Sequence, residues 1–532
     1  MTSEQTVRMK KKVDGKKRIV IISDTHITPT APIFNQKAFD KGMELISRIK
    51  DVDLYIHLGD ITHTGTLLEY EYTVEQMEKL KPVSGAPIYY CIGNHDAKNV
   101  GYLLFEELIG EGKRYFEFED DHLYILGIDS TKPDKATGVI HYKAINSVKK
   151  RITQTERKDK LKIICFHHQT IPIPNTGKSR SAIDDSGDML QMLLENEADL
   201  VLNGHRHISN LYNISSPKGK DLYIFNAGTF SAFKTRYREL FTYNIIDIER
   251  NSLNFKIIPI FDPQFKREIY RTIKHYSPRE VKLDEKPYCK IIQISNTLIS
   301  KESEHIETSF DKAIEEINKI QNVDLVVHAG NLTKNSYAEE FKIAKSKFDK
   351  LFPPYLVVPG YTDSKPPAWK YWLDHFKSLN PIYETEKLYF QGINSTTEDS
   401  KQGFIGRKKL QKLSKKVLNL SHEKIFGVCC FHTLIPTPLS VWKTELIDAG
   451  DSLSLFTSSQ IDLVLNSTPS ISFNAKIEDT IVSNGGNLES SHFDMNFVEI
   501  DIYKDGLLVL TEHNLITGEK KVIGSYHVTI LG

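Results

Sequence analysis

Short runs of β-branched and aromatic residues alternate along the chain with longer amphipathic stretches. Residues 18–28 read RIVIISDTHIT, which is the pattern of a buried strand that ends in a polar turn. Residues 34–52 carry apolar side chains at helical spacing, which predicts a helix with one face turned inward. These side chains are Phe39, Met43, Leu45, Ile46 and Ile49. Strands that alternate with helices predict an α/β domain whose functional loops lie at the strand ends.

The pattern changes near residue 220, where apolar runs follow one another without helices between them. The runs DLYIFNAG (221–228), LFTYNIIDI (240–248) and LNFKIIPI (253–260) are typical of antiparallel strands. A parallel part and an antiparallel part together favour a sandwich of two facing sheets with helices outside. We therefore predict a four-layer α/β/β/α domain.

The second half of the chain repeats the first half. KIIQISNTLIS (290–300) matches residues 18–28, VDLVVHAGNLTKNS (323–336) matches 52–65, and IDLVLNSTPS (461–470) matches 198–207. The offset between matching residues falls in order from 272 (Asp24 to Asn296) to 263 (His205 to Thr468), as a few short deletions would produce. We expect two tandem sandwiches, 16–262 and 288–532. We expect them to be joined by a basic, Pro-containing, partly helical connector at 263–287.

The composition is that of an ordinary globular protein of more than one domain. Of 532 residues, 40% are hydrophobic and 26% are charged, and 69 basic residues balance 69 acidic ones. A net charge of zero does not favour nucleic acid or an anionic membrane as partner.

The sequence pattern contains no recognisable targeting signal, so we expect a cytoplasmic protein. The basic N-terminus lacks the apolar segment of a signal peptide, and no run of about 18 apolar residues predicts a membrane span. The five cysteines form no Cys-x-x-Cys pair, which argues against a zinc ribbon and favours a reducing compartment.

Residues that can bind metals follow five of the predicted strands in the first copy. They are Asp24 and His26, then Asp60, then Asn94, His95 and Asp96, then His167 and His168, and finally His205 and His207. If these strands are neighbours, their ends converge. Carboxylate and imidazole ligands suit borderline divalent ions. Even seven ligands from this set would exceed the need of one tetrahedral ion and would suit two ions about 3.5–4 Å apart with a bridging carboxylate.

This ordered set resembles the motifs of the calcineurin-like metallophosphoesterase superfamily. The motifs are Asp-x-His, Gly-Asp, Gly-Asn-His-Asp, His and Gly-His-x-His, and all five occur in order within residues 18–230. The pair His167-His168, the Gly-His-x-His motif and the overall size together are most similar to the class III cyclic-nucleotide phosphodiesterase branch.

The resemblance implies a role for each of these residues. Asp24, His26 and His207 would bind one ion, Asp60 would bridge, and Asn94, His167 and His205 would bind the other. The metals would be Mn, Fe, Zn or Ni. His95 would not ligate but would donate to the phosphate or the leaving group, oriented by Asp96. Water activated between the ions would attack phosphorus in line. His167 is favoured over His168, although alignment with the second copy leaves that choice open.

The second copy has lost this set. Asn296, Leu298 and Asn331 stand where the first copy has Asp24, His26 and Asp60, and only Asp363 and His432 remain of the later motifs. The other replacements are Tyr361 and Thr362 for Asn94 and His95, and Thr468 and Ser470 for His205 and His207. We predict a metal-free pseudo-phosphoesterase. It would either pack on the first copy as an intramolecular pseudo-dimer or bind a ligand or partner in the vacated pocket.

Several other residues have a less specific pattern. Lys178, Arg180, Phe230 and Phe233 could reach a substrate, but loop or core positions explain them as well. His57 is kept as His328 and is predicted to be structural, and His63 is interpreted as a polar loop residue. Asp188 is kept as Asp451, and both are expected at helix starts.

These patterns favour a metal-dependent phosphodiesterase or phosphatase that acts on a small nucleotide-type substrate. The alternatives are a nuclease of the same chemistry and a non-catalytic binding scaffold. Neutral net charge argues against the nuclease, and the intact first cluster argues against the scaffold. The sequence leaves the substrate, the metal and the existence of a homo-oligomer open.

Overall fold

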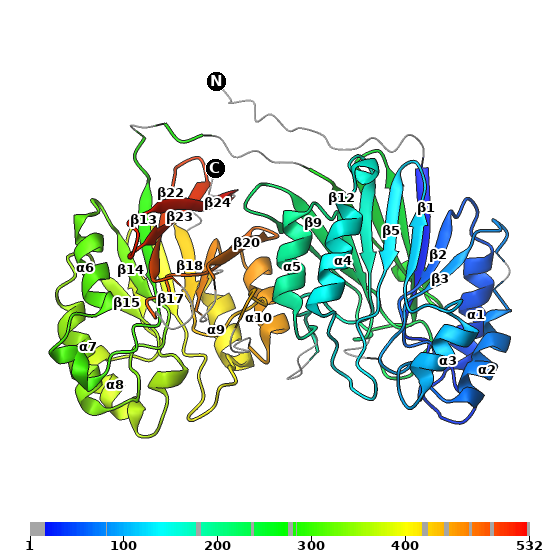
Figure 1. Ribbon diagram of the computed structural model, residues 1–532, viewed down its shortest axis with the longest axis horizontal. Coiled ribbons are helices and arrows are strands. Elements are labelled where there is room, and N and C mark those ends of the chain that lie inside the picture. Colours follow the sequence, from blue (N-terminus) through cyan, green and yellow to red (C-terminus); the bar gives the residue numbers. More distant parts are fainter. Residues whose placement is uncertain are drawn as a thin grey trace.

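The protein is described here by a computed structural model that covers most of the chain. The described residues are 16–80, 82–176, 182–235, 239–274, 280–282, 285–417, 424–440, 446–467, 471–489 and 494–528. Within them the chain forms two α/β halves that lie side by side and repeat one order of elements (Figure 1). Lys178, Arg180, Thr468 and Ser470, singled out from the sequence, lie outside the described residues.

One sheet of the first half has the strand order β12-β11-β10-β1-β2-β3 among the described residues. Its strands are β1 (Lys16–Ile22), β2 (Leu54–His57), β3 (Ile88–Tyr90), β10 (Thr242–Glu249), β11 (Ser252–Pro259) and β12 (Arg267–Thr272). β1, β2 and β3 are parallel, whereas β10, β11 and β12 pair antiparallel. The parallel part therefore brings the ends of β1, β2 and β3 to one edge.

The second sheet of the first half faces the first one. Its strands are β4 (Phe116–Glu119), β5 (Leu123–Gly127), β6 (Leu161–Cys165), β7 (Leu200–Asn203), β8 (Asn210–Ser215) and β9 (Asp221–Asn226). β5, β6, β7 and β9 are parallel, and β4 and β8 run antiparallel to their neighbours.

The second half has the equivalent strands in the equivalent order. Its first sheet runs β15-β14-β13-β22-β23-β24 within the described part of the chain. These strands are β13 (Cys289–Ile294), β14 (Leu325–His328), β15 (Tyr355–Val357), β22 (Asn496–Ile502), β23 (Leu507–Asn514) and β24 (Lys520–His527). The facing strands are β16 (Ile382–Glu384), β17 (Leu388–Gly392), β18 (Ile425–Cys429), β19 (Leu463–Asn466), β20 (Phe473–Ile477) and β21 (Thr480–Asn484).

Helices cover the outer face of each sheet. In the first half they are α1 (Gln36–Ser47), α2 (Leu67–Met77), α3 (Gly101–Leu108), α4 (Tyr142–Ile152) and α5 (Ser186–Glu195). In the second half they are α6 (Ser309–Lys319), α7 (Ala338–Phe348), α8 (Ala368–Phe376), α9 (Arg407–Val417) and α10 (Ala449–Ser458). Short 3-10 turns are η1 (Thr155–Arg157), η2 (Pro263–Phe265), η3 (Lys301–Glu304) and η4 (Tyr361–Asp363). Figure 1 shows α1–α3 at one end of the molecule, α6–α8 at the other, and α4, α5, α9 and α10 between them.

Alternating side chains explain why the strands of the inner sheets are apolar throughout. Along β1, Ile19 and Ile21 enter the core between the two sheets, whereas Val20 and Ile22 pack with the helices outside. A strand that is buried on both faces reads as a continuous hydrophobic run. The four-layer α/β/β/α arrangement follows, as the sequence predicted, and α1 buries Phe39, Met43 and Ile46.

Two expectations about the antiparallel region need correction. Residues 267–272 form the edge strand β12, paired with β11, and not the start of a partly helical connector. Charged residues are common on exposed edge strands, and their presence concealed this strand. The run at 221–228 forms β9, which pairs parallel with β7 and antiparallel with β8, in the sheet opposite β10 and β11.

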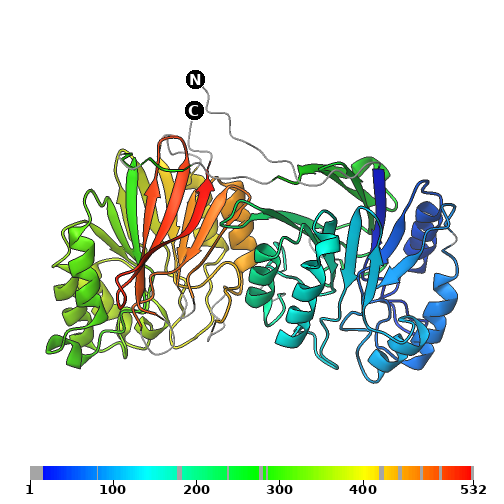
Figure 2. The same cartoon turned by 45° about the horizontal axis from the view of Figure 1, so that its top comes forward.

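The two halves are joined through a continuous sheet (Figure 2). They also share a hydrophobic core. β8 pairs antiparallel with β20, at Lys476 with Ser215 and Ile477 with Ile214. One hydrophobic cluster also contains buried residues of both halves, among them Ile173 and Ile435. The halves are therefore packed against each other as parts of one folded body. No helix in the described part of the chain is long and apolar enough to cross a bilayer.

Candidate metal centre

The predicted ligands lie directly after parallel strands, in tight turns of unusual backbone geometry. Five of them have φ in the left-handed region: Asp24 (52°), His26 (48°), Asp60 (52°), His205 (74°) and His207 (57°). Such residues each cost about 1–3 kcal/mol and persist where the surroundings hold them. Here the backbone N–H groups of Asp24 and His26 donate to the carbonyls of Gly59 and Asp60, both at 3.0 Å. The fold thus aims these side chains at one point.

One group of side chains consists of Asp24, His26 and His207, all buried. The Nε2 atom of His207 lies 3.3 Å from Asp24 Oδ1 and 3.2 Å from His26 Nε2. The Asp24 carboxylate also accepts the backbone N–H of His205 at 3.0 Å, which ties the first strand turn to the turn after β7.

A second group consists of Asp60, His167 and His205, with Asn94 beside it. His167 Nε2 lies 3.3 Å from Asp60 Oδ1, and Asn94 Oδ1 lies 2.8 Å from His205 Nδ1. The other oxygen of Asp60, Oδ2, lies 3.6 Å from His26 Nε2 of the first group. Asp60 therefore stands between the two groups, as a bridging carboxylate would.

The orientation of the imidazoles fits cation binding. His167 Nδ1 lies 2.8 Å from the Leu58 carbonyl, and His207 Nδ1 lies 2.6 Å from the Lys234 carbonyl. Each ring donates from Nδ1, so Nε2 is the atom that faces a carboxylate oxygen and that can bind a cation once it carries no proton. The buried Nε2 of His167 has no hydrogen-bond partner. Convergent lone pairs repel each other unless a cation lies among them, so the donor set suits divalent metals.

The electrostatics of the cluster agree with this arrangement. Burial lowers the pKa values of His26 and His205 well below 6.5, so both rings are neutral near pH 7 and free to ligate. Burial would also lower the pKa of His167, but the charge of Asp60 raises it to about 9. Without a metal, a proton on His167 compensates Asp60, and a cation can replace that proton.

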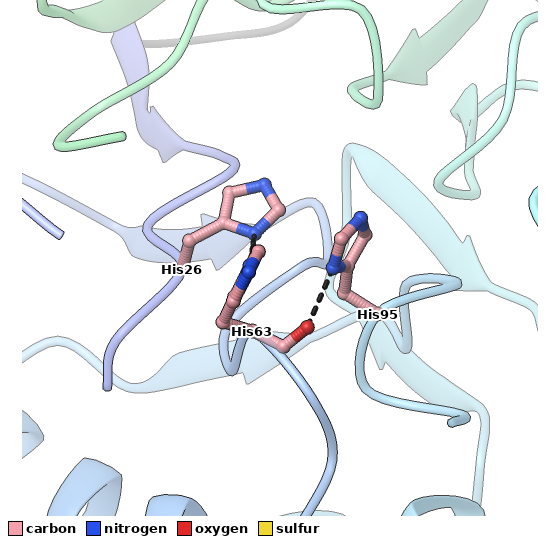
Figure 3. A group of neighbouring side chains, drawn as sticks. All are labelled: His26, His63 and His95. Atoms are coloured by element: carbon pink, nitrogen blue, oxygen red, sulfur yellow. Dashed lines mark hydrogen bonds between the residues drawn. The ribbon is translucent and has the colours of Figure 1, made fainter. Parts of the chain in front are cut away.

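His95 is held by His63, which the sequence analysis had interpreted as a loop residue. Figure 3 shows the rings of His26, His63 and His95 side by side. His95 Nδ1 lies 2.6 Å from the His63 carbonyl, and His63 Nδ1 lies 3.3 Å from His26 Nδ1. Lys98 Nζ lies 2.7 Å from His95 Nδ1. The change of His63 to Lys334 in the second half was the sequence signal for this role, because the other cluster residues changed as well.

Asp96 does not orient His95 as expected. Its carboxylate accepts the backbone N–H groups of Ile61 (3.1 Å), Thr62 (2.7 Å) and Gly93 (2.8 Å) and the Thr62 hydroxyl (3.0 Å). Burial and the charge of Asp60 raise its pKa to about 7, although the N–H donors oppose that rise. Asp96 therefore fixes the backbone of the turns that carry Asp60 and Asn94. It supports the site through these turns.

The structure resolves the alignment of the histidine pair with the second half. His168 Nδ1 lies 2.9 Å from Ser130 Oγ, and His432 Nδ1 lies 2.9 Å from Ser395 Oγ. His432 is thus the counterpart of His168, and Phe431 takes the place of His167. Of the pair in the first half, His167 belongs to the group around Asp60.

In the second half an amide network occupies the corresponding turns. Asn331 Nδ2 donates to Asn296 Oδ1 at 3.0 Å, and Asn296 Nδ2 donates to Asn487 Oδ1 at 3.0 Å. The Thr362 backbone and hydroxyl both donate to Asn331 Oδ1. The left-handed backbone persists at Asn296, Leu298 and Asn331 (54°, 45° and 58°). The polar groups satisfy one another, so this half keeps the turns without convergent lone pairs.

Of the less specific candidates, His57 and Phe230 have structural positions, whereas Phe233 lies at the surface. His57 Nε2 lies 3.0 Å from Thr25 Oγ1, and the equivalent His328 contact is 3.1 Å, as expected for a scaffold residue. Phe230 is fully buried against Phe39, and Phe233 is 57% exposed. In the described residues, every group of His and Asp side chains close enough to share an ion lies in the first half.

Comparison with known proteins points to one family. Residues 17–209 match the family model of the calcineurin-like phosphoesterases. A probable cyclic nucleotide phosphodiesterase of Xenorhabdus bovienii is 22% identical over 205 residues, which are 37% of this chain and 81% of that protein. A probable glycerophosphodiester phosphodiesterase of Arcobacter nitrofigilis is 29% identical over 167 residues, 29% of this chain and 58% of that protein.

Two of the solved structures that match part of the chain do so at low identity. A purple acid phosphatase from yellow lupin seeds is 13% identical with a TM-score of 0.39, over 48% of this chain and 54% of that chain. The Plasmodium inner-membrane-complex anchor GAP50 is 18% identical with a TM-score of 0.35, over 48% and 89%. The family uses divalent metals, and the clustered Asp, Asn and His side chains lie at the ends of the strands that its model covers. Residues 17–209 therefore match the calcineurin-like phosphoesterase family, and this match, with the phosphodiesterase names of the relatives, supports a phosphoric ester hydrolase.

Proposed function

We propose that the first half is a phosphodiesterase with a pair of divalent metal ions, acting on small nucleotide-type phosphodiesters. One observation carries this proposal: Asp60 stands between two ligand groups, with an oxygen 3.3 Å from His167 and another 3.6 Å from His26. Asp24, His26 and His207 would hold one ion, and Asn94, His167 and His205 the other. The two relatives described above carry phosphodiesterase names, which favours a diester as substrate.

The chain's own residues would position the substrate and move a proton. Bound divalent ions would supply positive charge for the phosphate oxygens and make a water more acidic. Lys98 Nζ lies within hydrogen-bond distance of both His95 Nδ1 (2.7 Å) and the His63 carbonyl (3.3 Å). When Lys98 donates to Nδ1, the neutral His95 ring carries its proton on Nε2, from which it would protonate the leaving oxygen. Lys98 places a further positive charge beside His95 and favours an anionic substrate. His63 and Lys98 thereby set the direction and the surroundings of the catalytic imidazole.

We further propose that the second half neither binds the metal pair nor catalyses. The amide network around Asn331 supports this, because its donors and acceptors are already paired. Counting β12 with the first half, the catalytic domain would extend to the end of β12 at Thr272, and the second domain would begin near β13 at Cys289. All five cysteines are buried and free, which fits a reducing, cytoplasmic environment.

The test is an assay with Mn²⁺ on bis(p-nitrophenyl) phosphate, cyclic nucleotides and glycerophosphodiesters. Asp60→Ala and His95→Ala should each lower kcat/KM by about 10³-fold or more, since they remove the bridge and the proton donor. The matched controls are Asn331→Ala and Thr362→Ala, which stand at the equivalent positions of the second half. They should leave kcat/KM within about twofold. Equal losses in the two sets would contradict a single catalytic half, and the substrate panel would rank the diester classes.

A further inference from the structure

The two halves exchange equivalent loops across their interface. We name the segments after the histidine positions the crossing loops: Gln169–Thr176 in the first half and Thr433–Ser440 in the second. Each begins beside the strand-end motifs of its own half and reaches a helix of the other half. Ile171, Ile173, Leu434 and Ile435 of these loops are buried in the core that the halves share.

The first crossing loop is held by the start of α10 in the second half. The backbone N–H of Asn175 donates to Asp451 Oδ1 at 2.7 Å. The backbone of Gly450 passes so close to the Ile173 carbonyl that an added Cβ would stand 1.9 Å from its oxygen. The loop is therefore fixed at two neighbouring points by residues of the other half.

The second crossing loop makes the same contacts in reverse. The backbone N–H of Leu439 donates to Asp188 Oδ1 at 2.9 Å, at the start of α5. A Cβ on Gly187 would stand 2.1 Å from the Thr437 carbonyl oxygen. Both aspartates lie in the first turn of a helix, as the sequence predicted, but each accepts from the opposite half. The interface thus contains the same aspartate-to-backbone contact twice, once in each direction.

Of the two crossing loops, only the first is hydrogen-bonded, among the described residues, to a turn that carries candidate metal ligands. Thr170 donates to Asn203 Oδ1, and Gln169 donates to the Gly204 carbonyl, immediately before His205. The Arg206 guanidinium, from the residue between His205 and His207, donates to the Thr176 carbonyl at 2.9 Å. The loop that presents two predicted ligands is therefore bound along one side by the crossing loop.

We infer that the second half positions the metal ligands of the first half, with Asp451 as the positioning residue. Asp451 holds Asn175, the crossing loop holds Arg206, and Arg206 fixes the turn that carries His205 and His207. This inference rests on the proposed metal site and explains why a half without the cluster is retained at the interface. It gives that half a role in shaping the site of its neighbour.

The test compares Asp451→Ala with Asp188→Ala, which removes the same contact in the opposite direction. Both variants should lower the melting temperature equally. In metal-free protein, Asp451→Ala should speed amide hydrogen exchange in residues 199–209 by about tenfold, and Asp188→Ala should not. Asp451→Ala should also weaken Mn²⁺ binding, measured by calorimetry, by about tenfold. Asp451→Asn keeps Oδ1 as an acceptor and should restore both properties.

Equal exchange of residues 199–209 in the two alanine variants would overturn the inference, whatever the activity. Unchanged Mn²⁺ affinity in Asp451→Ala would also overturn it. If the unmodified protein bound no Mn²⁺, the proposed function would fail, and the exchange comparison would still decide whether Asp451 fixes this turn.

Discussion

At the scale of single residues, Asp96 and Asp363 make the same contacts in the two halves. Asp363 accepts the backbone N–H groups of Leu332, Thr333 and Gly360 and the Thr333 hydroxyl, as Asp96 does at the equivalent positions. A buried carboxylate with four donors stabilises turns whether or not a metal lies beyond them. Residues kept in both halves thus form the scaffold, and residues that changed gather at the cluster.

The shared role gives a paired prediction. Asp96→Asn and Asp363→Asn each place an amide N–H₂ against backbone donors and should lower the free energy of unfolding by about 2–3 kcal/mol. Urea denaturation measures this loss. Asp363→Asn should leave kcat unchanged, and Asp96→Asn should keep the pH profile of kcat. A shifted profile in Asp96→Asn would instead support direct orientation of His95 by Asp96.

At the scale of elements, the sequence predicted most of the fold because each strand run ends in a polar turn. The helix at 36–47 and the parallel strands followed from hydrophobic periodicity. β12 was missed because its charged side chains match those of a connector. The pairing of β9 was missed because an apolar run indicates a strand but does not indicate which neighbour it joins.

The end of β14 gives a pH prediction. Burial lowers the pKa of His328 from 6.5 to about 3, and its Nδ1 accepts the Gly330 N–H at 3.2 Å. The unfolded chain binds this proton below pH 6.5 and the folded chain does not, so stability falls as the pH drops from 6.5 toward 3. The loss should reach about 1.4 kcal/mol per pH unit for this group.

Urea denaturation between pH 7 and pH 5 measures this dependence. His328→Gln should be less stable at pH 7 but should lose less stability on acidification. His305→Gln is the control, because the His305 side chain is 81% exposed. Equal slopes for His328→Gln and the unmodified protein would show that His328 takes up a proton in the folded state.

At the scale of the whole molecule, the sequence predicted the cluster but not the way in which the halves meet. The ligands could be found because each follows a strand, and parallel strand ends converge. The support of His95 by His63 depends on a carbonyl and a ring contact that spacing does not reveal. The exchange of crossing loops depends on packing between segments far apart in the sequence, such as Asn175 and Asp451, which are 276 residues apart.

The most direct test of the account is the metal content of the purified chain after loading with Mn²⁺ and gel filtration. We expect two ions per chain, lost in Asp60→Ala and kept in Asn331→Ala, because Asp60 joins both ligand groups and Asn331 belongs to a closed amide network. Turnover of bis(p-nitrophenyl) phosphate should follow the same pattern. Two ions retained in Asp60→Ala, or ions lost in Asn331→Ala, would contradict a metal pair confined to the first half.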